Sequence, residues 1–222
     1  MTTDSADLTL PQALEKHGLE LPEPQCQQVE RYCRLLWEWN RKFNLTRHTD
    51  FDVFVARDLV DTVQLGRLLE QGESVLDVGS GGGVPGLLLA ILRPDLDVTL
   101  SESVGKKATA LNAMVDALEL PVAVQACRAQ QVLEDFRFDA VVARAVGSLR
   151  KVLTWLAPHW ASIGRLLLIK GPQWVAERGE ARHYGLMHKL ELRRAAHYPM
   201  SGRDSESVIL EIRPKQATGK LQ

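Results

Sequence analysis

The sequence predicts an α/β protein with a doubly wound, mostly parallel sheet that follows a helical extension. From residue 74 onward, short apolar runs of strand length alternate with segments of helix length, as expected for strands joined by crossover helices. Before residue 74, the apolar residues recur at helical spacing. The last two predicted strands have no convincing helix between them, so we expect a β-hairpin to complete the sheet.

The extension is predicted to hold two helices. The first covers residues 25–41, has an apolar stripe, and follows two prolines that suit a helix start. The second covers residues 51–69, where apolar residues again recur at helical spacing. The polar and basic segment 40–47 connects them.

Strands and helices alternate in the remainder of the chain. We expect strands at 74–78, 98–100, 122–125, 140–143, 165–169, 190–196 and 208–212. Helices are predicted at 86–92, 106–118, 149–160 and 172–182, and a turn at 199–202. The predicted organisation is a helical extension at 1–72, a main domain at 73–214 and a disordered tail at 215–222.

Composition is typical of a globular domain. The chain has 222 residues, of which 45% are hydrophobic and 25% charged, and its net charge is −1. Its apolar runs are shorter than the ~20 residues that cross a bilayer, and no secretory signal is visible, so we expect no membrane partner. Three cysteines without a CxxC motif indicate reduced thiols and a cytoplasmic location. The net charge excludes a polycation but not a local basic face.

The strongest chemical signal is the segment DVGSGGGVPG, which begins at Asp77 after a predicted strand and leads into a predicted helix. Glycines there allow a tight turn and let a ligand approach the backbone, while the helix start adds oriented N–H groups. The spacing Gly81-x-Gly83-x-x-Gly86 matches the dinucleotide fingerprint. The spacing Asp77-x-Gly79-x-Gly81-x-Gly83 matches the loop of S-adenosylmethionine-dependent methyltransferases.

The position of the acid favours the methyltransferase pattern. A dinucleotide site has its acid about 20 residues beyond the glycines, whereas Asp77 precedes all of them. A carboxylate there would repel a pyrophosphate but suits the cationic amine of S-adenosylmethionine. Glu102, at the end of the next predicted strand, can accept both ribose hydroxyls of either cofactor. The alternative without a ligand is a merely tight strand-to-helix turn.

Arg144 and Lys170 close the fourth and fifth predicted strands, at the sheet edge where open α/β sheets bind ligands. Arg144 is placed to stack on a base, to contact guanine or to pair with a carboxylate. For both residues the alternative is a surface ion pair.

Basic residues cluster at Arg41, Lys42 and Arg47, and again at Lys106 and Lys107. Such patches bind phosphate-rich partners by charge neutralisation, although any single pair is more typical of a solvated surface. The six histidines form no metal-binding motif, and GxSxG and Walker motifs are absent from the sequence. We therefore expect no metal. The lack of an obvious base suits methylation of a ring nitrogen with an exposed lone pair, such as guanine N7.

Several runs beyond the glycine loop resemble the RsmG family, also called GidB, of bacterial 16S rRNA guanine-N7 methyltransferases. They are WNRKFNLT at 39–46, SES at 101–103 before the two lysines, ARA at 143–145 and KG at 170–171. The resemblance extends from Leu36 to Arg213. It implies a Rossmann-like class I methyltransferase fold, S-adenosylmethionine as cofactor, and N7 methylation of guanine 527 in 16S rRNA.

The resemblance also assigns residues by position. The family's cofactor contacts fall on Gly79, Val84, Ala129, Gln130 and Arg144, and Glu102 occupies its acidic position. Together with Asp77, Gly81 and Gly83 from the loop, these form the predicted cofactor site, and Arg144 is also expected beside the acceptor base. Arg41, Lys42, Arg47, Lys106, Lys107 and Lys170 are the predicted RNA contacts.

This sequence departs from the family at three places. Gln130 stands where the family often has an acid, Asp58 replaces a typical histidine, and SES at 205–207 replaces a typical Glu-Arg-His. The last two changes remove positive or titratable groups of the kind that contact RNA. Losing one phosphate contact weakens binding and lowers its salt dependence by about one in slope.

The sequence thus favours an S-adenosylmethionine-dependent rRNA guanine-N7 methyltransferase, monomeric and cytoplasmic, acting on 16S rRNA or the small ribosomal subunit. The first alternative is a methyltransferase of the same fold with another RNA or a small molecule as substrate. The others are an inactive RNA-binding relative and an NAD-dependent oxidoreductase.

Overall fold

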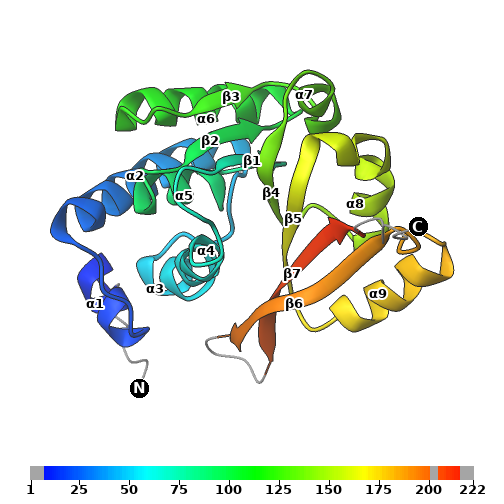
Figure 1. Ribbon diagram of the computed structural model, residues 1–222. Helices are drawn as coiled ribbons and strands as arrows, with labels where there is room; N and C mark the ends of the chain where they lie inside the picture. Colours follow the sequence, from blue (N-terminus) through cyan, green and yellow to red (C-terminus); the bar gives the residue numbers. More distant parts are fainter. Residues whose placement is uncertain (1–7, 201–204, 216–222) are drawn as a thin grey trace.

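A computed structural model of the chain describes residues 8–200 and 205–215. Seven strands form one sheet in the order β3-β2-β1-β4-β5-β7-β6, in which β7 alone runs against the others (Figure 1). The strands are β1 (Ser74–Val78), β2 (Asp97–Ser101), β3 (Ala123–Gln125), β4 (Phe138–Arg144), β5 (Ile163–Lys170), β6 (Leu190–Pro199) and β7 (Glu206–Pro214). The doubly wound sheet and its terminal hairpin are confirmed. Several strands are longer than predicted because exposed polar residues such as Asp139 extend them beyond their apolar runs.

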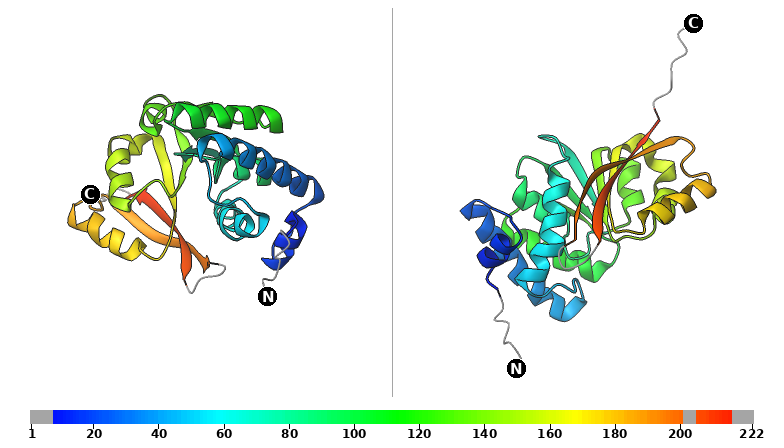
Figure 2. Two further views of the ribbon diagram at one scale, coloured as in Figure 1. Left: turned by 180° about the vertical axis from the view of Figure 1, so that it is seen from behind. Right: turned by 90° about the horizontal axis from the view of Figure 1, so that it is seen from below.

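Helices cover both faces of the sheet (Figures 1 and 2). On one face lie α5 (Gly86–Leu92) and α6 (Gly105–Leu118), together with the helices of the extension. On the other lie α7 (Ala129–Asp135), α8 (Leu149–Leu156) and α9 (Trp174–His183). The short α7 was not predicted. The predicted helix at 149–160 divides into α8 and the 3-10 turn η2 (Ala157–Ser162), whose Pro158 cannot donate a helical hydrogen bond.

The extension holds more elements than predicted. They are α1 (Leu10–Lys16), α2 (Glu23–Phe43), α3 (Phe51–Phe54), η1 (Val55–Leu59) and α4 (Val60–Gly66). The unpredicted α1 is preceded by Thr9, which caps the helix and forms a capping box with Gln12. The last three elements replace the single helix expected at 51–69, and η1 is a π-helical turn in which the Val60 N–H donates to the Val55 carbonyl.

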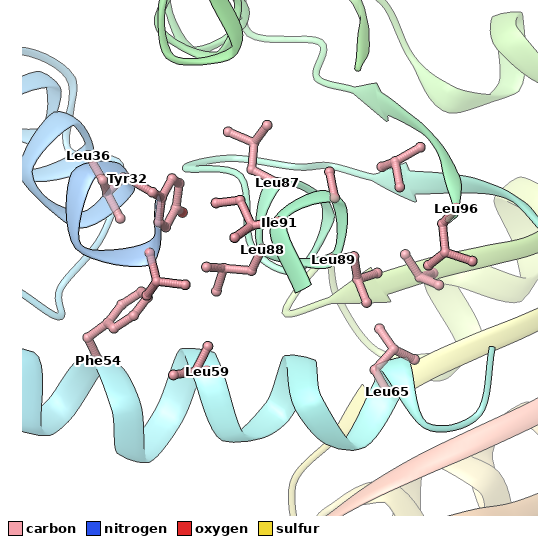
Figure 3. Packing of buried hydrophobic residues seen from close by; sticks show 14 of the residues in the cluster. Tyr32, Leu36, Phe54, Leu59, Leu65, Leu87, Leu88, Leu89, Ile91 and Leu96 are labelled. Carbon is pink, nitrogen blue, oxygen red and sulfur yellow. The ribbon is translucent and has the colours of Figure 1, made fainter. Parts of the chain in front are cut away.

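The extension and the sheet share one apolar core. Leu87, Leu88 and Ile91 of α5 point towards Tyr32 and Leu36 of α2 and towards the α3–η1–α4 helix, which contributes apolar side chains from the opposite side (Figure 3). The division into an extension at 1–72 and a domain at 73–214 therefore stays a prediction. Part of the predicted turn at 199–202 and the tail from residue 216 lie outside the described residues.

Candidate cofactor and substrate site

The glycine loop joins β1 to α5 at the carboxyl edge of the parallel strands. Gly79, Gly81 and Gly83 have φ values of 69°, 56° and 98°, a region that disfavours other residues. The loop packs closely as well: a Cβ on Gly86 would lie 2.2 Å from Cδ2 of Leu100. The sequence forms this turn because glycine alone fits both its dihedral angles and its close contacts.

Asp77 lies behind the loop. Its Oδ2 accepts a hydrogen bond of 3.1 Å from the Gly86 N–H, while Oδ1 is buried and has no hydrogen-bond partner in the described part of the chain. The residue is 1% exposed, and burial raises the pKa of its carboxyl to about 7. Asp77 therefore braces the start of α5. Its expected contact with the amine of S-adenosylmethionine stays a prediction.

Glu102 holds the loop from the second strand. One carboxylate oxygen accepts the Gly81 N–H at 3.0 Å and the other accepts the Val104 N–H at 2.8 Å. The side chain is buried between the glycine loop and the segment that leads into α6. Each carboxylate oxygen can accept a further hydrogen bond, so these two bonds leave room for the predicted ribose contact. That contact stays a prediction.

The extension reaches the loop from the opposite side. The Tyr32 hydroxyl on α2 donates to the Gly82 carbonyl at 2.9 Å, within the shared core. After α2, Asn40 Oδ1 accepts the N–H groups of Leu45 and Thr46 at 2.6 and 2.9 Å. Asn44 ends the helix with φ of 50°. Part of the run 39–46 therefore shapes the chain beside the glycine loop.

Three clefts meet at the carboxyl edge. The Gln130 cleft, of about 450 Å³, lies between the glycine loop and the start of α7. The His48 cleft, of about 820 Å³, lies between that loop and the segment that follows α2. The Tyr198 cleft, of about 370 Å³, lies between η1, the ends of β4 and β5, and the β6–β7 hairpin. All three include Ala145, and Arg144 lines the second and the third.

Most predicted cofactor contacts line two of these clefts. Gly79, Ala129 and Gln130 line the Gln130 cleft, whereas Gly81, Val84 and Arg144 line the His48 cleft, and Gly79 belongs to both. A larger cleft of about 980 Å³ lies between α9 and the β6–β7 hairpin. The predicted cofactor residues do not line it, so size alone does not identify the site.

The two adjoining clefts fit S-adenosylmethionine. A Cβ on Gly79 would lie 2.8 Å from Cγ1 of Val146, so the wall at that point is bare backbone. In the Gln130 cleft, the polar Gln130 faces the same space as Val146 and Trp155, a combination that suits an adenosyl group. In the His48 cleft, the glycine loop and Arg144 suit the charged amino-acid end.

Arg144 is held by two carboxylates of the extension. Its Nη1 lies 2.5 Å from Asp58 Oδ1, and its Nε lies 3.0 Å from Asp61 Oδ2. Burial lowers the pKa of the guanidinium, but the two carboxylates more than offset this and raise it. Asp58 also accepts from Nδ1 of His48 at 2.9 Å, and the Tyr198 hydroxyl donates to Asp61 at 2.7 Å. The alternative of a surface ion pair at Arg144 is therefore wrong, because the arginine belongs to a largely buried network.

Asp58 has a different role from the one that the sequence suggested. Its departure from the family predicts a lost RNA contact, yet its side chain is 3% exposed and binds Arg144 inside the protein. In the departure at 205–207, Ser207 is buried and lines the Tyr198 cleft. Asp58 and Ser207 therefore both lie at the site itself. Sequence reasoning missed Asp61, His48 and Tyr198; the i,i+3 spacing of Asp58 and Asp61 on one helix was the available signal.

The predicted RNA contacts differ in their surroundings. Arg41 and Lys42 are exposed on the last turn of α2, and Arg47 is exposed in the His48 cleft. Lys106 and Lys107 lie in the first turn of α6, near the same sheet edge.

Lys170 is already engaged. Its ammonium donates to the Gly147 carbonyl at 2.5 Å and to Glu177 at 2.8 Å, and the same Glu177 oxygen accepts the Leu149 N–H. These contacts fix the loop after Arg144 to α9. A role of Lys170 in RNA binding stays a prediction.

Neither a membrane span nor a metal centre is found in the described parts of the chain. Within residues 8–200 and 205–215, no helix is long and apolar enough to cross a bilayer. In the same ranges, no three His, Cys, Asp or Glu side chains are grouped so that they could hold a metal ion.

Solved structures of other proteins share this fold. TrmK of M. capricolum, in complex with S-adenosylhomocysteine, aligns with a TM-score of 0.56 and 13% identity over 72% of this chain and 70% of its own. A ribosomal protein L11 methylase of Lactobacillus delbrueckii subsp. bulgaricus aligns with a TM-score of 0.52 and 19% identity over 70% of this chain and 78% of its own. The fold is the Rossmann-like class I methyltransferase fold.

Sequence comparisons identify the family. A protein named ribosomal RNA small subunit methyltransferase G from Rhodopirellula baltica is 57% identical over 85% of this chain and 81% of its own length. A protein of the same name from Roseiflexus sp. is 41% identical over 74% and 73%. The family model GidB, described as rRNA small subunit methyltransferase G, matches residues 25–203. The chain belongs to the GidB family.

Proposed function

We propose that this protein transfers a methyl group from S-adenosylmethionine to N7 of a guanine in 16S ribosomal RNA. The observation that carries the proposal is the meeting of clefts at Arg144 and Ala145, because it provides adjoining spaces for a methyl donor and an acceptor. Membership of the GidB family supports ribosomal RNA as the substrate. The cytoplasm follows as the location of the reaction if the small subunit is the partner.

The residues of this chain have positioning roles in the proposal. Gln130 and Trp155 would hold the adenosyl group, and the loop around Gly81 would hold the amino-acid end. When bound, S-adenosylmethionine supplies a methyl group activated on its sulfonium. Arg144 is fixed by two carboxylates and lines both the His48 and the Tyr198 clefts, so it would orient the donor and the acceptor relative to each other.

A ring nitrogen suits this arrangement. N7 of guanine exposes a lone pair and needs no proton removed before attack. The buried carboxylates of Asp58 and Asp61 would also stabilise the positive charge that arrives on the methylated base. Arg47 lines the His48 cleft, and together with Arg41 and Lys42 on the last turn of α2 it would bind phosphates.

The test is methyl transfer from labelled donor to small ribosomal subunits isolated from a strain that lacks this gene. We expect incorporation into 16S rRNA, and nucleoside mapping by mass spectrometry should place it on guanine N7. The Gly81→Asp variant should lose donor binding in calorimetry, because an added side chain and charge would occupy the loop. A label on another base or RNA would refute the assigned specificity. Donor affinity unchanged in Gly81→Asp would refute the donor site.

A further inference from the structure

The Tyr198 cleft contains three cationic side chains, two of which have carboxylate partners. Arg144 is paired with Asp58 and Asp61, and Lys170 is paired with Glu177. Arg57 also lines this cleft, and within the described ranges it forms no ion pair within 4.0 Å. Its Nη1 is buried and has no hydrogen-bond partner among the residues that the structure describes. Buried donors rarely lack a partner, so this one requires an explanation.

The π-helical turn accounts for the position of Arg57. Within η1, Asp58 and Leu59 are buried, the former against Arg144 and the latter in the core shared with α5. Arg57 precedes them and lines the cleft instead. Asp61 is close enough for Arg57 to favour its charged form, although burial raises the pKa of that carboxyl overall. The helix thus brings a guanidinium to the cleft, and among residues 8–200 and 205–215 this group has no ion-pair partner.

The walls of the cleft suit a planar base. Ile169 at the end of β5 and Tyr198 and Met200 on the hairpin supply apolar and aromatic surface. Apolar walls contribute little to the binding of a phosphate. An unstacked base, in contrast, is held by aromatic and apolar side chains and recognised by hydrogen bonds. A guanidinium donor requires an acceptor on that base. Guanine presents the acceptor O6 where adenine presents a donor amino group.

We propose that the Tyr198 cleft receives the target guanine after it leaves its stack, and that Arg57 donates a hydrogen bond to its O6. This inference rests on the proposed function. A contact to O6 alone leaves N7 free to accept the methyl group, unlike the bidentate arginine contact to O6 and N7 that is common in nucleic-acid recognition. Arg57 is thus a substrate-binding residue that selects guanine.

The test compares Arg57→Gln and Arg57→Lys with the control Arg34→Gln, using undermethylated small subunits as substrate. Arg34 is a matched arginine of the extension whose side chain is 72% exposed and pairs with Glu30. We expect kcat/KM for the subunit to fall about 10- to 100-fold in Arg57→Gln, as for the loss of one charged hydrogen bond. The lysine variant should retain part of the activity. Melting temperature and donor affinity by calorimetry should match those of the control.

Each outcome separates the inference from its premise. If the wild-type protein transfers no methyl group to the subunit, the proposed function fails before Arg57 is tested. If it does, and both Arg57 variants stay within about twofold of the control, the inference is wrong. A loss of donor affinity in the variants would overturn it too. A fall of about one in the salt slope of kcat/KM would assign Arg57 to a phosphate and also overturn it.

Discussion

Asp77 fixes the end of the glycine loop by accepting a hydrogen bond from the Gly86 N–H. The sequence predicted an acid at the end of the first strand, and the structure has one there, but burial and the bond to the Gly86 N–H could not be read from spacing. A single sequence gives the position of a side chain along a strand more readily than the groups that surround it. Asp58 illustrates the same limit, because its partner Arg144 lies 86 positions away.

The carboxyl of Asp77 should make the stability of the protein depend on pH. Its pKa is raised from 3.8 to about 7, so between these values the folded state keeps a proton that the unfolded state releases. The contribution of Asp77 to the free energy of unfolding should therefore decrease as pH rises from about 4 to about 7.

Chemical denaturation of the wild-type protein and Asp77→Asn at several pH values measures this contribution. The stability of the wild type relative to the variant should fall between pH 4 and pH 7. A difference that is constant or rises with pH would contradict the raised pKa.

At the scale of elements, the contact between α2 and the glycine loop links the extension to the site. The Tyr32 hydroxyl and the Gly82 carbonyl form a hydrogen bond between segments 50 positions apart. The periodicity of α2 predicted the helix but not this bond, since an apolar stripe indicates which face is buried and not what lies against it. The π-helical turn was equally hidden, because a regular helix and a helix with one π turn have similar apolar patterns.

Tyr32→Phe should lower the free energy of unfolding by about 1 to 2 kcal/mol, because the Gly82 carbonyl would stay buried without its donor. The affinity for S-adenosylmethionine should fall as well, because the glycine loop would lose the hydrogen bond that fixes it to α2. Urea denaturation and calorimetry measure the two effects. Tyr184→Phe is the control, because Tyr184 is 59% exposed and its ring packs beside Arg150. Equal effects of both variants would show that the Tyr32 bond contributes nothing specific.

At the scale of the whole molecule, the extension and the sheet share a continuous core, so they should unfold cooperatively. Leu87 and Leu88 of α5 are fully buried in a cluster that includes residues of α2 and α4. The sequence predicted the sheet, its hairpin and most helices because their apolar runs are distinct. It could not predict how the extension packs, since that depends on contacts between segments far apart in the chain.

We therefore expect one calorimetric transition for the intact chain, with equal calorimetric and van't Hoff enthalpies. A chain that begins at residue 73 would expose α5 and α6, and should bind a hydrophobic dye and aggregate. Two transitions, or a well-folded shortened chain, would contradict the shared core and support separate domains.

The two outer strands of the sheet, β3 and β6, affect how readily the protein aggregates at high concentration. At one border β3 has only three residues, and at the other β6 departs from regular register between Arg194 and Ala196. The exposed Arg193 and Arg194 add charge to that border. Short, irregular and charged borders discourage pairing with a strand of another molecule. The described strands at both borders are therefore poor templates for pairing between copies of the protein, and we expect the protein to stay dispersed at high concentration.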